Sequence, residues 1–444
     1  MRLDKLTLRN FRGFTEREFA FGPGFNLIVG ENGSGKTTVL AAAAVALDLP
    51  VYLLASDAES GHYTLSDVHR RAIQMGEALT FEPQWPAIVE AEGGMGGGKA
   101  YAWKRERFPD GGEGKPVAST RVPSSGSRFI ADLKLLAQQV QQGSPVLLPL
   151  IACYPAGRLW SEPTDEVEPS ESEKLSLTRF EGYRDCLHGR SSKRDLNRWI
   201  FKQDIKALKG NGSATSYAAM KQAILNCLPG GKDVTMDYDL TQAAVIMEDG
   251  NAVLLDDLSD GLRTMVTLVG DLARRAITLN PWMGADVLQQ TEGVVLIDEL
   301  DLHLHPKWQR RVIDDLRRTF PRVQFICTTH SPFLIQSLQP GELIQLQPGG
   351  EDTDYAGQSI EDIVEHIQGV ALPQQSHRAE RLNEATARYF ELLQKNGSTH
   401  PEELAQAERE FREAGEGFST QPGLEAVLKL EALAAEHGIK QSVP

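Results

Sequence analysis

Residues 25–47, FNLIVGENGSGKTTVLAAAAVAL, decide the fold. The apolar run at 25–29 is typical of a buried strand, and the stretch 36–47 indicates a helix. Between them, residues 30–37, GENGSGKT, match the phosphate-loop pattern G-x-x-x-x-G-K-[ST] in the strand-to-helix context that this pattern requires. The glycines let successive backbone N–H groups point into one concavity that holds phosphate oxygens, and the helix N-terminus adds its positive dipole end. The segment therefore predicts an α/β nucleotide-binding unit.

Side chains at the end of this loop suit phosphates and a metal ion. Lys36 would reach the β- and γ-phosphates, and Thr37 would give its hydroxyl to Mg²⁺. We therefore expect ATP and Mg²⁺ as ligands. The loop residues expected to bind the nucleotide are Gly30, Asn32, Gly33, Ser34, Gly35, Lys36, Thr37 and Thr38.

A second acidic element is needed beside a phosphate loop, and residues 294–299, VVLIDE, supply it. The apolar run predicts a buried strand that delivers two carboxylates at its end. Asp298 would belong to the Mg²⁺ shell, and Glu299 is placed to polarise a water in line with the γ-phosphate. An apolar run that ends in Asp-Glu is common by itself. It indicates a nucleotide site only because the same chain also contains a phosphate loop.

Two further segments carry polar residues that suit a nucleotide site. His330 follows the apolar run at 323–328 and can hydrogen-bond the γ-phosphate or the attacking water, although a lone histidine there is usually a capped surface residue. Residues 258–263, LSDGLR, open a predicted helix, where Ser259 and Gly261 can present a hydroxyl and free N–H groups to an anion. The alternative for Ser259 is a plain helix N-cap. Both alternatives stay open at this point.

Composition limits the classes of protein to consider. The 444 residues carry 46 Lys and Arg against 61 Asp and Glu, and 46 − 61 gives a net charge of −15. This charge disfavours a protein that constitutively coats DNA or an anionic membrane. At roughly 150 residues per domain, the length suggests about three structural units. Four cysteines lie far apart without a C-x-x-C pair, which fits a reducing compartment, and we expect a cytoplasmic protein that binds no membrane. They are Cys153, Cys186, Cys227 and Cys327.

The remaining pattern mixes strands and helices. Residues 86–93 and 99–108 predict a hairpin across a glycine run, which lacks the Lys-[ST] and the helix of a second phosphate loop. Further strands are expected at 2–9, 146–153 and 323–328, and helices at 128–142, 261–279 and 306–320. Three polar helices are expected at 376–395, 401–414 and 423–437.

In this order, the motifs resemble the ATP-binding-cassette ATPases of the SMC and RecF-like class. The resemblance spans roughly residues 1–48 and 250–347 and includes LRNFRGF at 8–14. It implies a head-to-tail dimer with two nucleotides between the heads. It further implies that Ser259 and Gly261 act in trans on the partner's nucleotide. The other roles that it implies are Glu299 as the catalytic carboxylate, His330 as the switch histidine, Asp301 in the loop that crosses the interface and Arg12 as a nucleotide contact.

This sequence differs from the SMC and RecF-like class in two features, and further motifs point to a more specific group. About 200 residues, rather than a long coiled coil, separate the phosphate loop from the signature, and the signature is LSDGL instead of LSGGQ. Together with YPAGRLW at 154–160 and TTHSPFLIQS at 328–337, the motifs resemble the compact antiphage ATPases represented by the PtuA subunit of Septu systems and its retron-associated relatives. That resemblance implies a separately encoded HNH nuclease as partner, with retron RNA or a reverse transcriptase as further candidates. The chain itself contains no recognisable nuclease motif.

The expected fold is therefore an α/β P-loop NTPase head of the ABC/SMC type with an antiparallel β subdomain, an inserted mixed, mainly helical lobe and a C-terminal helical appendage. Residues 1–55 and 250–370 would form the two parts of the head. Residues 56–249 would form the insertion, and 371–444 would form the appendage, a candidate docking platform for a partner.

Several alternatives remain. A RecF-like ATPase that clamps DNA is the second functional hypothesis; residues 70–71 and 104–107 are its candidate phosphate contacts. A third is a protein that binds ATP without turnover. His303 and His305 have metal-ligand spacing, but in this class of ATPase the run is simply the connection after the acidic strand. Asp237 and Asp239 are interpreted as part of a β segment.

Overall fold

The computed structural model divides the chain into two units, Met1–Gln368 and Gly369–Pro444, where the composition suggested about three. Each unit is described by itself. The described residues are 1–55, 63–76, 78–96, 98–109, 118–119, 124–157, 178–188, 193–208, 214–347, 355–371, 373–374, 376–394 and 401–415.

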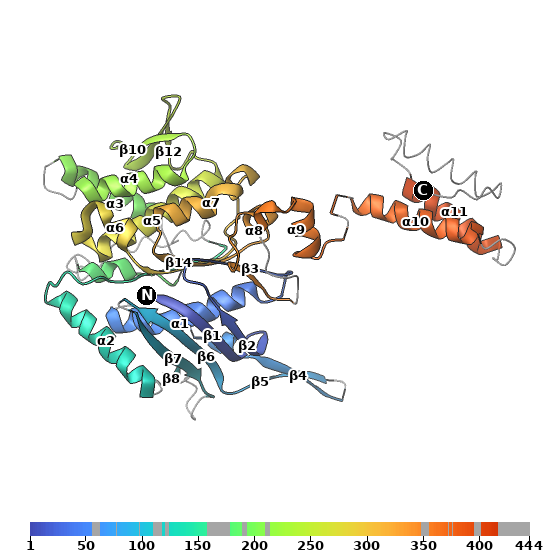
Figure 1. Cartoon of the computed structure of the whole chain (residues 1–444), viewed down its shortest axis with the longest axis horizontal. Coiled ribbons are helices and arrows are strands. Elements are labelled where there is room, and N and C mark those ends of the chain that lie inside the picture. The colour runs from blue at the N-terminus through green and yellow to red at the C-terminus, as the bar shows by residue number, and fades with distance from the viewer. Residues whose placement is uncertain are drawn as a thin grey trace. The chain divides into compact units, whose positions relative to one another are not determined.

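A five-stranded parallel sheet forms the centre of the first unit (Figure 1). The strand that precedes the phosphate loop is directly beside the strand that precedes His330, and the acidic strand follows next. Because all five strands are parallel, their carboxyl ends meet at one edge of the sheet, where ligands of open α/β sheets bind. In sheet order the strands are β15 (Leu343–Gln345), β3 (Phe25–Val29), β14 (Val323–Thr328), β13 (Gly293–Ile297) and β9 (Leu150–Tyr154).

Helix α1 (Lys36–Leu54) contacts strands of both this sheet and a second, antiparallel sheet. Helix α2 (Ser124–Gln141) packs on α1 and on the antiparallel sheet. In the described part, α1 is the one helix with the length and mean hydropathy of a membrane span, and 72% of that window is buried inside the protein. In order, the antiparallel strands are β2 (Phe14–Ala20), β1 (Arg2–Phe11), β6 (Ala87–Met95), β7 (Lys99–Arg107) and β8 (Ala118–Ser119).

This pairing corrects the expectation of a separate insertion over residues 56–249. Strand β6 pairs with β1 from Arg9↔Ile88 to Arg2↔Gly94, so the predicted hairpin β6–β7 completes the sheet that the N-terminal strands begin. Strand β9, also inside that range, forms the edge of the parallel sheet. The segment is therefore distributed over both sheets because its apolar strand faces are buried against elements of the head.

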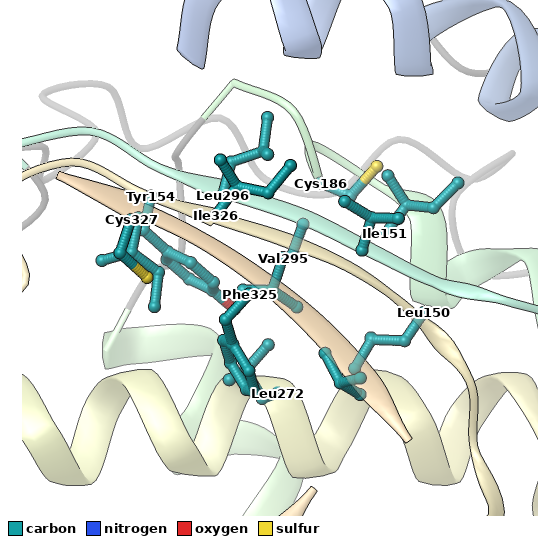
Figure 2. Close-up of a cluster of buried hydrophobic side chains, with 14 of the residues drawn as sticks. Leu150, Ile151, Tyr154, Cys186, Leu272, Val295, Leu296, Phe325, Ile326 and Cys327 are labelled. Carbon is teal, nitrogen blue, oxygen red and sulfur yellow. The ribbon is translucent and has the colours of Figure 1, made fainter. Parts of the chain in front are cut away.

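The core of the parallel sheet alternates between its two faces, as pleated strands require. Phe325 lies toward Leu272 of helix α5 (Asp260–Leu279), whereas Leu296 and Ile326 point to the opposite face (Figure 2). All five residues of β13 and all six of β14 are buried. These two strands therefore form a rigid support for the polar residues that follow them.

The other helices and strands of the first unit complete the head. Helix α7 begins with Pro306 in its first turn, as predicted, and its N-cap is His305. The helices are α3 (Lys193–Leu208), α4 (Ala214–Cys227), α6 (Val287–Gln290), α7 (Pro306–Thr319), α8 (Pro332–Gln336) and α9 (Ile360–His366). A three-stranded antiparallel sheet contains β10 (Gly231–Asp237), β11 (Gln242–Met247) and β12 (Ala252–Leu254).

Helices α10 (His377–Gln394) and α11 (Pro401–Gly415) form the described part of the second unit. Tyr389 of α10 stacks on Phe411 of α11 with 5.6 Å between ring centroids. Leu382 of α10 and Ala407 of α11 are buried. The helix predicted at 423–437 lies outside the described residues.

A two-stranded hairpin, β4 (Arg70–Met75) and β5 (Ala78–Pro83), was not predicted. Its apolar side chains Met75, Leu79 and Phe81 are exposed, so the sequence lacks the buried face whose periodicity would reveal it. Arg70 and Arg71 at its base are exposed too.

The basic stretch 104–107 is not a surface for nucleic acid, contrary to the candidate contact suggested above. Arg105 is buried and pairs with buried Asp48 of α1 at 3.0 Å. Arg107 is also buried and donates to the carbonyl of Tyr63, while Lys104 pairs with Glu106 at 2.8 Å. Arg105 and Arg107 therefore join β7 to the segments packed against it, whereas Lys104 pairs within the strand.

Candidate functional site

The phosphate loop joins β3 to α1 and depends on two glycines in left-handed backbone conformations. Gly33 has φ +82°, and Gly35, the N-cap of α1, has φ +102°. A Cβ on Gly35 would also lie 2.6 Å from Cζ of Phe14. Phe14, from the NFRGF segment, thus packs directly on the loop, and no larger residue than glycine fits at position 35.

Polar groups of the loop are arranged for a phosphate ligand. The Lys36 ammonium donates to the carbonyls of Gly30 at 2.8 Å and Glu31 at 3.0 Å. Burial lowers the pKa of Lys36, and the negative charges of Asp298 and Glu299 partly offset that shift. The Ser34 hydroxyl is buried and has no hydrogen-bond partner among the described residues. A buried hydroxyl without a partner inside such a loop fits a phosphate oxygen as its partner.

The phosphate loop and the acidic strand meet through one hydrogen bond. Thr37 Oγ1 donates to Asp298 Oδ2 at 2.9 Å, across 261 residues of sequence. Asp298 is buried, whereas Thr37 is exposed at the start of α1. A threonine hydroxyl and a carboxylate are oxygen ligands of the kind that Mg²⁺ prefers, so the pair fits that ion. The structure brings together the two residues that the sequence assigned to the metal.

Glu299 follows Asp298 in an unusual backbone conformation. Its φ is +49°, in the left-handed region that side chains other than glycine rarely adopt. Its backbone N–H donates to Thr328 Oγ1 at 2.8 Å. The Glu299 side chain is half-buried, and its backbone is held at the end of the strand by Thr328.

Asp301 connects the segment after the acidic strand to the switch-histidine region of the same chain. It accepts hydrogen bonds from Thr329 Oγ1 at 2.5 Å and from the His330 N–H at 3.4 Å. The His330 carbonyl accepts from Gln368 Nε2 at 2.8 Å, and the imidazole is exposed. His330 is thus held through its backbone on both sides.

Ser259 and Gly261 lie at the N-terminus of α5. Ser259 is exposed and occupies the N-cap position, but its hydroxyl makes no capping hydrogen bond. Gly261 is buried: a Cβ there would lie 2.4 Å from the His303 carbonyl oxygen. The glycine of LSDGL therefore allows the helix to rest on the loop that follows the acidic strand.

Two family models match the chain in this region. Residues 122–336 match "AAA domain, putative AbiEii toxin, Type IV TA system", and residues 5–211 match "AAA domain". The chain is 25% identical over 387 residues to "Retron Vc95 probable ATPase" of Vibrio cholerae serotype O1 biovar El Tor, covering 76% of this chain and 72% of that protein. The chain has the α/β fold of an ABC/SMC-like P-loop ATPase. The loop and acidic strand just described are its predicted nucleotide-binding site.

Other comparisons add to the description of this ATPase. It is 40% identical over 129 residues to "Septu protein PtuA" of Bacillus mycoides strain KBAB4, covering 29% of this chain and 17% of that protein. The solved "SMC head domain from Thermotoga maritima" has a TM-score of 0.40 and 16% identity, over 78% of this chain and 94% of that one.

Arg12 of the ATPase lies in the turn between β1 and β2. Its guanidinium donates to buried Asp67 Oδ1 at 2.8 Å and lies 5.8 Å from the centre of the Phe11 ring. Phe14 of the same turn contacts the phosphate loop, so Arg12 is close in sequence to the site but its charge is engaged by Asp67. A nucleotide contact by Arg12 stays a prediction.

His303 and His305 have backbone and capping roles in the ATPase. His303 adopts φ +63°, and its carbonyl lies against Gly261. His305 Nδ1 accepts the N–H of Lys307 at 3.2 Å and so caps α7. Asp237 ends β10, and its carboxylate accepts from the Leu240 N–H in the turn that contains Asp239.

Two residues that the sequence analysis did not single out, Thr328 and Gln309, form hydrogen bonds to the segments that follow β13 and β14. Thr328, the last residue of β14, donates to Asp298 Oδ1 at 2.5 Å. Gln309 of α7 donates to the Leu304 carbonyl at 2.8 Å and accepts from Ser331 Oγ at 2.7 Å. Thr328 lies within the TTHSPFLIQS motif quoted for the resemblance, but nothing in the sequence pairs it with Asp298, 30 residues away.

Proposed function

We propose that this ATPase hydrolyses ATP with Mg²⁺ between two copies of the chain arranged head to tail. The observation that carries the proposal is the hydrogen bond between Thr37 and Asp298, which joins the phosphate loop to the acidic strand. Ser259 is exposed and its hydroxyl is not used as a cap, which supports a role for this residue on the nucleotide of a partner copy.

In this proposal each side chain has one task. Backbone N–H groups of residues 30–37 and the Lys36 ammonium bind the β- and γ-phosphates. Thr37 and Asp298 would hold Mg²⁺, which when bound neutralises charge on the phosphate oxygens. Glu299 accepts a proton from the attacking water, and His330 hydrogen-bonds the γ-phosphate. Asp301 holds the backbone at His330 in its own chain, and its position in the loop that crosses the dimer interface stays part of the proposal.

We further infer that the ATPase works in the cytoplasm as a switch in antiphage defence. Similarity to a retron ATPase and to a Septu protein supports this role. The proposed output is control of a separately encoded HNH nuclease, and retron RNA or a reverse transcriptase are further proposed partners. The second unit, residues 369–444, is the proposed docking platform.

A RecF-like ATPase that clamps DNA is the second candidate. A match of 62% identity over 42 residues to "DNA replication and repair protein RecF" of Magnetococcus marinus favours it, although the match covers only 10% of this chain. Burial of Arg105 and Arg107 removes one of its two candidate contacts and leaves Arg70 and Arg71 on the exposed hairpin. Tight, salt-sensitive DNA binding without any partner protein would favour this candidate.

Glu299→Gln tests the central proposal, because it removes the proton acceptor and retains the side-chain size. We expect ATP binding to persist, phosphate release to fall about 10²- to 10⁴-fold, and ATP to trap a dimer. Phosphate release and the mass in solution with ATP are the measurements. Glu248→Gln, in an exposed turn after β11, is the charge-matched control and should leave both unchanged. Unchanged turnover in the Glu299 variant would contradict the proposal.

A further inference from the structure

Thr328 is the point at which the strand before His330 contacts the acidic segment. It is the last residue of β14, and none of its surface is exposed. Its hydroxyl donates to Asp298 Oδ1 at 2.5 Å and accepts from the Glu299 N–H at 2.8 Å. Its carbonyl accepts the Leu300 N–H at 2.9 Å. One residue therefore contacts three consecutive residues of the acidic segment.

The donors and acceptors around this hydroxyl allow one arrangement. A backbone N–H can only donate, so the Thr328 oxygen accepts from Glu299. The single hydroxyl proton is then directed to Asp298 Oδ1. The other carboxylate oxygen of Asp298, Oδ2, accepts from Thr37 on the phosphate loop at 2.9 Å. Thr328 thus fixes which oxygen of Asp298 faces the loop.

The same hydroxyl also supports the backbone of Glu299. A φ of +49° is unfavourable for glutamate and persists only where surrounding contacts hold it. The bond from the Glu299 N–H to Thr328 is such a contact, at the residue that turns the chain away from the strand. The direction in which the Glu299 carboxylate leaves the sheet therefore depends on Thr328.

We propose that Thr328 is a positioning residue of the ATPase, which sets the geometry of the metal-binding carboxylate and of the proton acceptor through one hydroxyl. The inference rests on the roles proposed above for Asp298 and Glu299. Thr328 touches neither nucleotide nor metal in this proposal. Residues that orient metal ligands in this way typically change metal affinity or activity by about 10- to 100-fold when they are replaced.

The test compares two substitutions with opposite predictions. Thr328→Val keeps the shape and removes the hydroxyl, whereas Thr328→Ser keeps the hydroxyl and removes the methyl group. With a nonhydrolysable ATP analogue, we expect Thr328→Val to weaken Mn²⁺ binding about 10- to 100-fold and to lower kcat by a similar factor. Binding of the analogue without metal should stay within about twofold, because the phosphate loop is untouched. Thr328→Ser should restore Mn²⁺ affinity.

Thr319→Val is the matched control. Thr319 in α7 is equally a buried threonine, and its hydroxyl donates to the Asp315 carbonyl at 2.7 Å and lies 3.6 Å from Cys227 Sγ. The control should lower thermal stability to a similar degree without any change in Mn²⁺ affinity. An equal effect of both valine substitutions on Mn²⁺ affinity would overturn the inference, because it would show a general packing effect.

The remaining outcomes separate this inference from the proposed function. If Asp298→Asn and Glu299→Gln abolish turnover but Thr328→Val binds Mn²⁺ normally, Thr328 has no positioning role and the function stands. If Asp298→Asn and Glu299→Gln turn over ATP normally, the proposed function itself fails. Should Thr328→Val not fold, Thr328→Ser decides alone: weakened Mn²⁺ affinity despite the retained hydroxyl contradicts the inference, and normal affinity supports it.

Discussion

Gly261 illustrates how a single residue position is determined by a neighbouring backbone. The His303 carbonyl oxygen would lie 2.4 Å from a Cβ at this position, well inside van der Waals contact. The first turn of α5 and the loop after the acidic strand can approach each other this closely only because residue 261 has no side chain. The exposed Ser259 is thereby fixed in position relative to that loop.

We expect Gly261→Ala to destabilise the ATPase by about 1–3 kcal/mol, as overpacking does, and to reduce ATP turnover. Alanine is otherwise the better helix former by roughly 0.5–1 kcal/mol, so a loss of stability would identify the contact as its cause. Urea unfolding measures the change. Gly24→Ala is the control, since nothing lies within 4 Å of its Cβ position, and it should stay within about 0.5 kcal/mol. A stabilised Gly261 variant would contradict the assignment.

Local sequence predicts the residues of the candidate site, but it does not predict the residues that support them. Gly35, Lys36 and Thr37 follow one another, so their chemistry can be recognised in a pattern of eight letters. Thr328 contacts Asp298 across 30 residues, and only the parallel pairing of β13 and β14 brings the two together. The sequence of either strand does not predict which distant strand it pairs with.

At the scale of elements, a buried ionic network joins α5 to β9 and to residues 179–184. Asp271 of α5 accepts from Tyr154 Oη at 2.7 Å and from Arg275 Nε at 2.7 Å. Arg275 also donates to the carbonyls of Gly182 at 2.9 Å and Arg184 at 2.8 Å. Burial alone would raise the pKa of Asp271, but attraction to Arg275 and Arg274 outweighs it and lowers the pKa well below its usual range.

We expect Asp271→Asn to lower the free energy of unfolding by about 3–5 kcal/mol, because it leaves Arg275 buried without its counter-ion. Because the pKa of Asp271 is lower in the folded protein than in the unfolded chain, its ionisation stabilises the fold at pH values above the unfolded pKa of about 3.9. This stabilisation is lost as the pH falls below that value. The difference between wild type and variant should therefore be constant from about pH 8 to 5 and shrink below about pH 4. Denaturant unfolding at several pH values measures it.

Asp314→Asn provides the comparison for that experiment. Asp314 pairs with Arg317 at 2.8 Å, but its side chain is 66% exposed, so we expect a change of less than about 1 kcal/mol. A loss for Asp271→Asn as small as that for Asp314→Asn would show that the buried network does not stabilise the junction.

Element boundaries show where periodicity misleads. The apolar run 146–153 predicted a strand, yet β9 covers Leu150–Tyr154. Pro149 has no N–H to donate, so the ladder begins only after it. Hairpin β4–β5 was missed for a different reason, because both of its faces are largely exposed and carry no alternation of burial.

For the whole molecule, the division after Gln368 separates the catalytic proposal from the docking proposal. Both sheets and every residue assigned to the nucleotide belong to Met1–Gln368. The sequence predicts a boundary near residue 371, because the ATPase motifs end before it and the helices after it are mostly polar. The sequence could not predict which sheets the strands of residues 56–249 join, because the order of strands in a sheet depends on contacts between distant segments.

Deletion of residues 369–444 tests that division. We expect the shortened ATPase to keep turnover within about threefold, because the second unit supplies no residue to the proposed site. It should no longer co-purify with an HNH nuclease encoded beside it. Phosphate release and pull-down from co-expressing cells are the measurements. Undiminished recovery of the nuclease would place its docking surface on the first unit.

The bond from Gln368 to the His330 carbonyl lies at the end of the first unit, one peptide bond before the second begins. The residue next to the boundary therefore holds the backbone of the histidine. Thermodynamic linkage makes such a connection symmetrical: whatever factor nucleotide imposes on the affinity for a bound protein, that protein imposes on the affinity for nucleotide. We therefore expect nucleotide bound to the first unit and a partner bound to the second to be read by each other as a change in affinity.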